Sequence, residues 1–524
     1  MSTAPPAQNT EQFFAKGQLH GPWPDVSTWG RMMPGPGAPA SASTIVAVLA
    51  ATVVAAVSLP LDQPGLGWLI TALAGGIALL VARPATSAVP PLVIRPARRR
   101  RGDQLFWGVA TIALLGVGTF RAAGWLFALC LLTATLTFAL AIGAGRSIRA
   151  MLTTYLMAPR AILRSLPWLV RGLARMRRTG NGPAPIRIIA TLAVSVVLLT
   201  VFGLLFASAD PTFARLFDTI LPDLRVDGMF RWIFICCLAA PVFGGAAFLL
   251  AAPPDLTELD HTEGRKVSRL EWAVPLSLLT LLFAAFVVVQ LVPLFGGDRH
   301  VRTTAGLTYA EYARGGFWQL CFVTGLTLLV LAGAARWAPR EAPADRTVFR
   351  AVLGPLTGLT LLIVASALIR MQAYIDIYGL TRLRLLVACC EVWFGVVLIL
   401  VLLAGIRIRA PWLPRVAIAT GVLALLGLAV ANPDLMIARN QVDAPVGRID
   451  VAYLSDLSPD AVPAVIELSD ARDRSCVLYH LGLTIADSDW QAWNLGRSTA
   501  MDLIGNGAYP MDPDGCAALT RSGA

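Results

Sequence analysis

Long apolar runs are the feature that most constrains this chain. Eleven of them recur between Ser43 and Asn432, each nearly free of charge and close to the roughly 20 residues that cross a bilayer core as a helix. The 524 residues are 56% hydrophobic and 14% charged, and the mean hydropathy is +0.66. Helices of a water-soluble domain alternate apolar with polar positions, so this pattern excludes a soluble enzyme fold. The sequence predicts an all-α fold, a polytopic transmembrane helical bundle, with spans at 43–59, 67–82, 104–120, 123–143, 186–207, 230–252, 272–295, 316–335, 350–370, 383–406 and 412–431.

The distribution of arginine predicts the orientation of this bundle. All but two of the 43 cations are arginines, and the formal net charge is +11. One loop holds Arg83, Arg95 and residues 98–101, and the stretch from Arg146 to Arg187 holds nine arginines and no acid. Since cations concentrate in cytoplasmic loops, we expect the amino terminus inside and the carboxyl terminus outside. These loops are expected to contact anionic lipid headgroups, and no nucleic-acid partner is expected.

Composition divides the chain into three regions. We expect residues 1–42 to form a flexible cytoplasmic tail and residues 43–431 to form the transmembrane bundle. Residues 432–524 are expected to form a small helical domain outside the cytoplasm. The last region has thirteen acids against six arginines, which suits the outer side. It also contains Cys476 and Cys516, for which a disulfide and two free thiols remain alternatives. The other six cysteines lie within spans and are expected only to pack.

Glu391 is the strongest functional candidate inside the membrane, because a carboxylate in hydrocarbon is costly and cannot face lipid as an anion. Ten helical residues from Thr381 place it roughly 15 Å below the outer surface, near the middle of the bilayer. Arg384 lies seven residues earlier on the same face, and Arg370 ends the preceding span. Two roles stay open for Glu391: a structural ion pair, and a group that couples to a proton or a substrate.

The outer loops hold the densest polar cluster. Its candidate residues are Glu311, Tyr312 and Arg314 before the eighth span, and Tyr374, Asp376 and Tyr378 before the tenth. Tyr374 and Tyr378 share a face if this segment is helical. Tyrosine and arginine at this depth are typical of the interfacial belt, so belt residues and a headgroup or substrate site are the alternatives.

Four motifs resemble a known family. They are Phe206-Ala207-Ser208-Ala209-Asp210-Pro211, Tyr309-Ala310-Glu311-Tyr312-Ala313-Arg314-Gly315-Gly316-Phe317, Tyr378-Gly379-Leu380-Thr381-Arg382 and Trp493-Asn494-Leu495-Gly496-Arg497. Together they resemble a bacterial family of multi-pass membrane proteins catalogued only as a domain of unknown function, over roughly residues 185 to 500. The resemblance implies a location in the bacterial inner membrane. It implies no activity and no catalytic residue.

Missing motifs narrow the function further. No Gly-rich loop ends in Gly-Lys-Ser/Thr, no His-Glu-x-x-His occurs, and all four histidines fall outside the spans. We therefore predict no catalytic residues, no cofactor and no metal site. The favoured class is a transport-like or lipid-handling protein with a site toward the outer leaflet. The alternative is a non-transporting envelope sensor or assembly scaffold that binds a protein partner through residues 432–524. An enzyme acting on lipids through Glu311, Asp376 and Glu391 is the third class.

Overall fold

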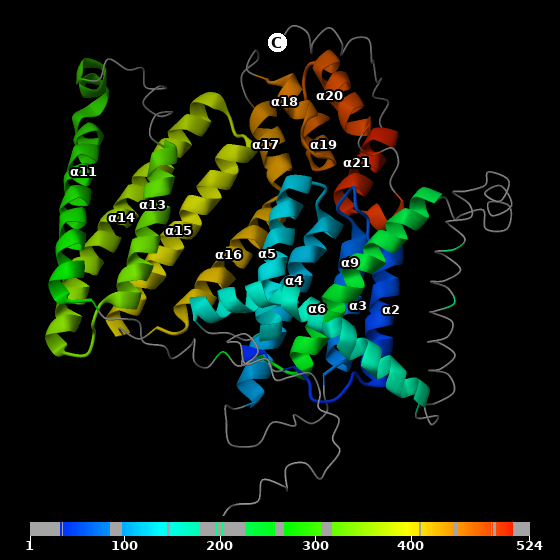
Figure 1. The fold of residues 1–524 in the computed structure, drawn as a ribbon. Coiled ribbons are helices and arrows are strands. Elements are labelled where there is room, and N and C mark those ends of the chain that lie inside the picture. Colours follow the sequence, from blue (N-terminus) through cyan, green and yellow to red (C-terminus); the bar gives the residue numbers. More distant parts are fainter. Residues whose placement is uncertain are drawn as a thin grey trace, which may run out of the picture.

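The computed structural model describes residues 32–33, 35–83, 97–143, 147–178, 195, 202, 226–254, 256, 267–304, 317–407, 410–443, 449–483, 485 and 489–506. Within these ranges the chain forms helices and no strand, which confirms the all-α fold (Figure 1). The helices are α2 (Ala42–Ser58), α3 (Leu66–Val81), α4 (Ala97–Phe120), α5 (Gly124–Gly143), α6 (Ile148–Arg178), α9 (Val226–Ala251), α11 (Arg269–Thr304), α13 (Phe317–Trp337), α14 (Pro343–Tyr378), α15 (Arg382–Arg407), α16 (Leu413–Ala431), α17 (Pro433–Val442), α18 (Val451–Ser455), η2 (Pro459–Ala461), α19 (Val462–Val465), α20 (Ala471–Leu483), η3 (Trp490–Ala492) and α21 (Leu495–Asn506).

Eight of the described helices are long and apolar enough to cross a membrane, namely α4, α5, α9, α11, α13, α14, α15 and α16. The apolar helices α2 and α3 are shorter. Ten of the eleven predicted spans therefore coincide with an apolar helix. The remaining one, 186–207, lies outside the described residues apart from Ser195 and Phe202. The protein is thus a multi-pass helical membrane protein.

The membrane helices form two groups side by side (Figure 1). Helices α2 to α6 and α9 make the first group, and α11, α13, α14 and α15 make the second. Helix α16 joins them, since it contacts α15 as well as α4 and α5. We call the end of the bundle that carries α17 to α21 the upper end, and the end where α13 stops and α14 starts the lower end. At the lower end, the Arg415 guanidinium of α16 is 2.6 Å from the Asp103 carboxylate of α4.

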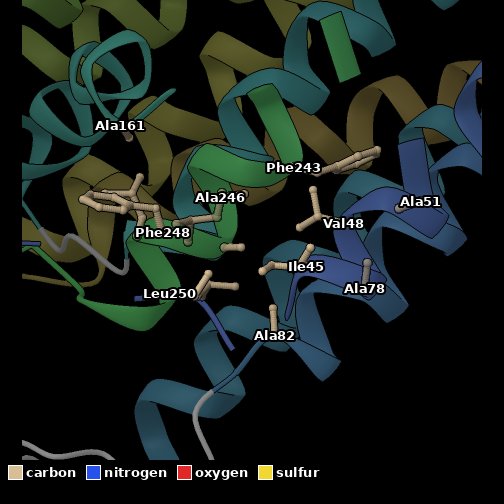
Figure 2. Close-up of a cluster of buried hydrophobic side chains, with 14 of the residues drawn as sticks. Ile45, Val48, Ala51, Ala78, Ala82, Ala161, Phe243, Ala246, Phe248 and Leu250 are labelled. Carbon is tan, nitrogen blue, oxygen red and sulfur yellow. The ribbon is translucent and has the colours of Figure 1, made fainter. Parts of the chain in front are cut away.

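Small side chains allow the helices of the first group to approach closely. In the core of this group, Phe243 and Phe248 of α9 pack with Ile45 and Val48 of α2 and with alanines of α3 and α6 (Figure 2). Near the upper end of this group, a Cβ on Gly67 of α3 would stand 1.6 Å from the Ser58 carbonyl oxygen of α2. The hairpin of α2 and α3 therefore closes only because position 67 lacks a side chain.

Helix α6 is strongly amphipathic and runs across the other helices of its group (Figure 1). Its buried positions recur with the helical period and include Met157 and Trp168. Pro159 and Pro167 lie within the helix but on its exposed side, where the carbonyl groups they leave without an intrahelical bond remain accessible. The exposed side also carries Leu163 together with arginines, a composition typical of helices at a membrane surface.

We predict that Gly67→Ala prevents the hairpin of α2 and α3 from closing, because the added methyl overlaps the Ser58 backbone. The expected loss is about 3 kcal/mol or more of folding free energy, measured by thermal unfolding of the detergent-solubilised protein. Gly76→Ala in the same helix is the matched control, since its Cβ would meet only the Ile112 Cδ1 atom at 3.6 Å. That variant should be unchanged or stabilised by about 1 kcal/mol. Equal thermal stability of the two variants would refute the close approach.

Candidate functional site

Glu391 is fully buried in the middle of α15, and neither of its carboxylate oxygens has a hydrogen-bond partner. The thiol of Cys321 on α13 interacts with the carboxyl, but without a hydrogen bond of ordinary geometry. Arg370 instead donates to the Gln290 side chain of α11. Neither of the two arginines considered as ion-pair partners bonds to Glu391 in this structure.

The second of those arginines, Arg384, belongs to an aromatic cluster at the upper end of α14. Its guanidinium carbon lies 4.3 Å from the centre of the Tyr374 ring and 5.9 Å from that of Tyr378, within the range of cation–π attraction. It also donates to the Tyr378 carbonyl oxygen at 2.9 Å. The two tyrosine rings are 4.8 Å apart, because α14 continues helically as far as Tyr378.

The remaining candidates of the upper end are only partly placed. The Asp376 carboxylate accepts a hydrogen bond of 2.9 Å from Gln372, one helical turn earlier. Glu311, Tyr312 and Arg314 lie outside the described residues. The structure therefore brings Tyr374, Tyr378 and Arg384 together and leaves Glu391 apart from them.

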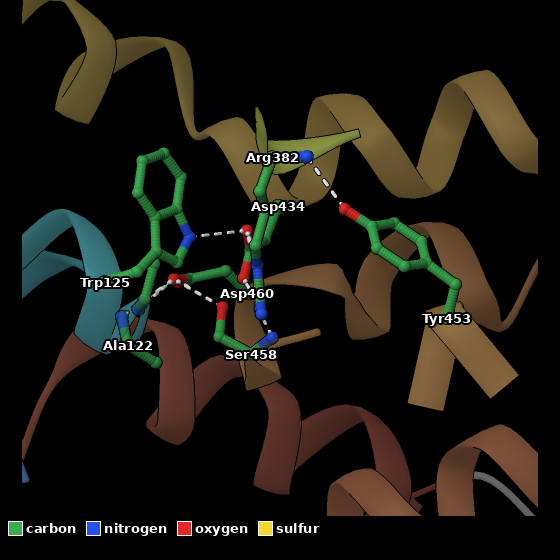
Figure 3. A network of polar contacts seen from close by, with 8 residues as sticks. Ala122, Trp125, Arg382, Asp434, Tyr453, Ser458 and Asp460 are labelled. Atoms are coloured by element: carbon green, nitrogen blue, oxygen red, sulfur yellow. Dashed lines mark hydrogen bonds and ion pairs between the residues drawn. The ribbon is translucent and has the colours of Figure 1, made fainter. Parts of the chain in front are cut away.

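A buried polar network that the sequence analysis did not identify surrounds Asp434, at the start of α17 (Figure 3). The Arg382 Nη2 atom of α15 donates to the Asp434 Oδ2 atom at 2.6 Å, and the Trp125 Nε1 atom of α5 donates to Oδ1 at 3.1 Å. The backbone N–H of Ser458 donates to the same carboxylate at 2.9 Å. Burial alone would raise the pKa of Asp434, but the hydrogen bonds from Arg382 and Ser458 outweigh it and hold that pKa below the ordinary value.

Asp460 makes the second buried carboxylate contact at the upper end. Its Oδ2 atom accepts hydrogen bonds from the backbone of Ala122 and Ala123, in the turn between α4 and α5, at 2.7 and 3.1 Å. Its Oδ1 atom has no partner and lies where a Cβ on Gly496 would fall, at 1.9 Å. Burial raises the pKa of Asp460 above the ordinary value, and the hydrogen bond from Ala122 only partly opposes this.

The motif at residues 493–497 anchors α21 to the first group of helices. Asn494 is fully buried, donates to the Gly118 carbonyl oxygen at 3.3 Å and accepts from the Arg497 backbone at 2.8 Å. The Arg497 side chain donates to the carbonyl oxygens of Pro64 and Ala492. The residues that resembled a family motif thus attach α21 to the upper turns of the bundle.

A cavity of about 980 Å³ opens at the lower end, between α13, α14, α15 and the starts of α6 and α16. Apolar side chains such as Leu331, Leu353 and Val401 form much of its wall. Four arginines also line it, Arg149, Arg336, Arg340 and Arg350, and no acidic residue does so among the described residues. The sequence signal for it was the presence of arginine at the lower end of several spans, but their convergence on one cavity required the tertiary structure.

The arginines that line this cavity make different contacts with the rest of the protein. Arg350 donates to the carbonyl oxygens of Gly405 and Ile406 at 3.2 and 2.7 Å, at the end of α15. The Arg340 guanidinium lies 4.9 Å from the centre of the Phe349 ring. The Nε atom of Arg336 is buried and has no hydrogen-bond partner.

The cysteines are divided between the tail and the membrane helices. Cys476 of α20 is buried and disulfide-bonded, whereas the six cysteines of the spans are free. Cys516, its predicted partner, lies outside the described residues, so this pairing stays a prediction. Among the described residues no three histidine, cysteine or acidic side chains are grouped as metal ligands would be.

The comparison with protein families places the chain in one of them. The family described as a domain of unknown function (DUF4153) matches residues 109–468, and the chain belongs to it. This agrees with the resemblance drawn from the motifs, although the closing motif at 493–497 falls beyond the matched residues. No curated protein and no solved structure matches the chain.

We predict that Asp434→Asn costs about 3 kcal/mol of folding free energy, because it leaves the Arg382 guanidinium without its counter-ion. The pKa of Asp434 is held below its ordinary value of 3.8. The ionised carboxylate therefore contributes its full stabilisation above pH 3.8, and the protein loses this contribution as the pH falls below that value. The wild type should therefore lose this contribution on acidification, and Asp434→Asn should lose less. Thermal unfolding from neutral to acidic pH measures both.

Asp460→Asn serves as the comparison, because the pKa of Asp460 is shifted upward whereas that of Asp434 is shifted downward. A carboxyl whose pKa is raised stabilises the fold while the pH is below the ordinary pKa of the group. This stabilisation is lost as the pH rises through the raised pKa. At neutral pH the neutral amide should therefore be nearly neutral or stabilising, since its oxygen can still accept from Ala122 and Ala123. A larger loss from Asp460→Asn than from Asp434→Asn would overturn these assignments.

Proposed function

We propose that this chain binds and handles an anionic lipid or lipid-like solute in the bacterial inner membrane. The observation that carries this proposal is the cavity at the lower end, which combines apolar walls with four arginines and no acid among the residues described there. A molecule that bears a phosphate headgroup and acyl chains has the complementary chemistry. Basic pockets between membrane helices on the cytoplasmic side bind lipids of this kind.

The arrangement of the arginines supports a headgroup site. Guanidinium groups bind phosphate through paired N–H donors, and four arginines line this cavity. Arg149 and Arg350 are both exposed, Arg149 at the start of α6 and Arg350 with its side chain bonded to the end of α15. Leu331 and Leu353 lie further along α13 and α14 from the same ends, where acyl chains would pack.

The predicted topology would place this cavity on the cytoplasmic side, in the same region as the arginine-rich helix α6. The sequence analysis favoured a site toward the outer leaflet instead, on the residues at the upper ends of α14 and α15. The proposal moves to the lower end because a cavity of about 980 Å³ lies there, lined by four arginines and by no acidic residue among those described.

A second candidate function is an envelope scaffold, and one observation favours it. Large apolar side chains of the last described helices are exposed, including Trp490 at 52% and Trp493 at 42%. Exposed tryptophans suit either a protein partner or the interfacial region of the outer leaflet. The scaffold function therefore predicts a protein ligand at the upper end, and the lipid function predicts a lipid at the lower end.

We predict that the full-length protein retains anionic phospholipid and that Arg336→Gln/Arg340→Gln weakens this retention about tenfold or more, which corresponds to about 1.4 kcal/mol. The measurement is native mass spectrometry of protein in nanodiscs containing phosphatidylglycerol and phosphatidylcholine. Arg439→Gln/Arg472→Gln is the charge-matched control, because both residues are exposed on the tail helices α17 and α20.

Equal lipid retention by the wild type and both double variants would reject the headgroup site. A stoichiometric envelope protein that is lost on Trp490→Ala/Trp493→Ala, with no selective retention of phosphatidylglycerol, would support the scaffold. Retention of phosphatidylglycerol that only the cavity variant reduces would support the lipid-handling function.

A further inference from the structure

The eight spanning helices contain five acidic residues whose side chains the structure describes, and four of these have partners. Asp103 pairs with Arg415, Asp345 pairs with Arg269, Glu271 accepts from the Ser268 backbone, and Asp376 accepts from Gln372. Glu391 is the exception, with both oxygens unpartnered and no exposed surface. It also lies deepest, since nine residues of helix from Arg382 correspond to roughly 14 Å of rise.

The described residues packed against Glu391 present no cation to it. Helix α13 presents the Cys321 thiol, and the adjacent residue on α15 is Cys390. On α14, Val364 and Ala367 are buried apolar residues of the cluster that includes Val387 of α15, and no charged residue lies between them. The nearest arginine of α14 is Arg370, which donates to Gln290.

The remaining charges around α15 are engaged elsewhere. The one titratable group of α16 is Arg415, paired with Asp103 at the lower end. At the upper end, Arg382 is paired with Asp434 of α17. Arg384 lies over the ring of Tyr374. Among the described residues, a negative charge on Glu391 would therefore have neither a counter-ion nor a hydrogen-bond donor of ordinary geometry.

A buried carboxylate without such partners costs several kcal/mol, so this packing is compatible only with the neutral acid. We propose that Glu391 is a reversible proton-binding site at the contact between α13 and α15. In the packed state the carboxyl holds its proton beside Cys321. When α13 separates from α15, water enters and the acid releases the proton to it, leaving a hydrated carboxylate.

This inference goes beyond the lipid site, because its ligand is a proton. It also has a structural consequence for that site, since α13 and α15 both line the cavity at their lower ends. A separation of the two helices at Glu391 changes the distance between two walls of the cavity. Protonation of Glu391 and the shape of the cavity are therefore linked through the same pair of helices.

The test uses dicyclohexylcarbodiimide, a carbodiimide that partitions into the bilayer and reacts with protonated carboxyls. The acid adds across a C=N bond of the reagent and the adduct rearranges to a stable N-acylurea, so no atom leaves. In the full-length protein in nanodiscs, peptide mass spectrometry should find Glu391 labelled, with labelling lost as the pH rises. The paired acids Asp103 and Asp345 serve as internal references and should remain unlabelled.

Opening of the helix contact is measured by the reaction of Cys321 with a membrane-permeant maleimide. Cys389, which packs toward α16, corrects for the general rise in thiol reactivity with pH. The ratio of Cys321 to Cys389 labelling should rise with pH in the wild type, by up to about tenfold per pH unit in the titration range. In Glu391→Gln, a neutral side chain of the same shape, the ratio should stay constant and the protein should fold normally.

Three outcomes would overturn the proposal: no carbodiimide label on Glu391 at any pH, a ratio of Cys321 to Cys389 labelling that does not change in the wild type, or failure of Glu391→Gln to fold. The last result would show that the packed helices do not accept a neutral side chain of this shape at position 391. The carbodiimide label and the labelling ratio are both measured on wild-type protein. These two measurements therefore test the proton-binding site even if the Glu391→Gln variant is not obtained.

Discussion

The carboxylate of Asp434 has no exposed surface, and the upper end of the bundle is organised around its need for hydrogen-bond donors. The donors come from three distant parts of the chain: Trp125 in α5, Arg382 in α15 and Ser458 in the tail. A charge removed from water must be paired and fully hydrogen-bonded, so the three elements are held in one arrangement. This network links the two groups of membrane helices to each other and to the tail.

The two ends of the bundle are therefore built on different chemistry. At the upper end buried side chains bond to one another and to the backbone, and Asp460 and Asn494 extend these contacts to the upper turns of the first group. At the lower end four arginines converge on a cavity that no acidic residue lines among those described. A network of buried hydrogen bonds suits a rigid attachment, whereas a positively charged cavity suits an anionic ligand.

Helices α13 and α15 connect the two unusual features of the second group. They hold Glu391 and Cys321 between them near mid-membrane, and their lower ends line the arginine cavity. A buried carboxyl that must be neutral in one packing and hydrated in another makes the contact between these helices two-state. Proton binding and lipid binding would then influence each other through helix position, without direct contact between the two sites.

The sequence by itself located the apolar helices that the structure describes, because the thickness of a bilayer imposes a length and a polarity that can be read along the chain. It also marked Glu391 as unusual, since any acid inside such a run is costly. Partner choice was decided only by the tertiary structure: Arg384 lies on Tyr374, Arg370 bonds to Gln290, and Glu391 is left alone. Sequence spacing places residues on a helix face, but which face meets which neighbour depends on how helices far apart in the chain pack together.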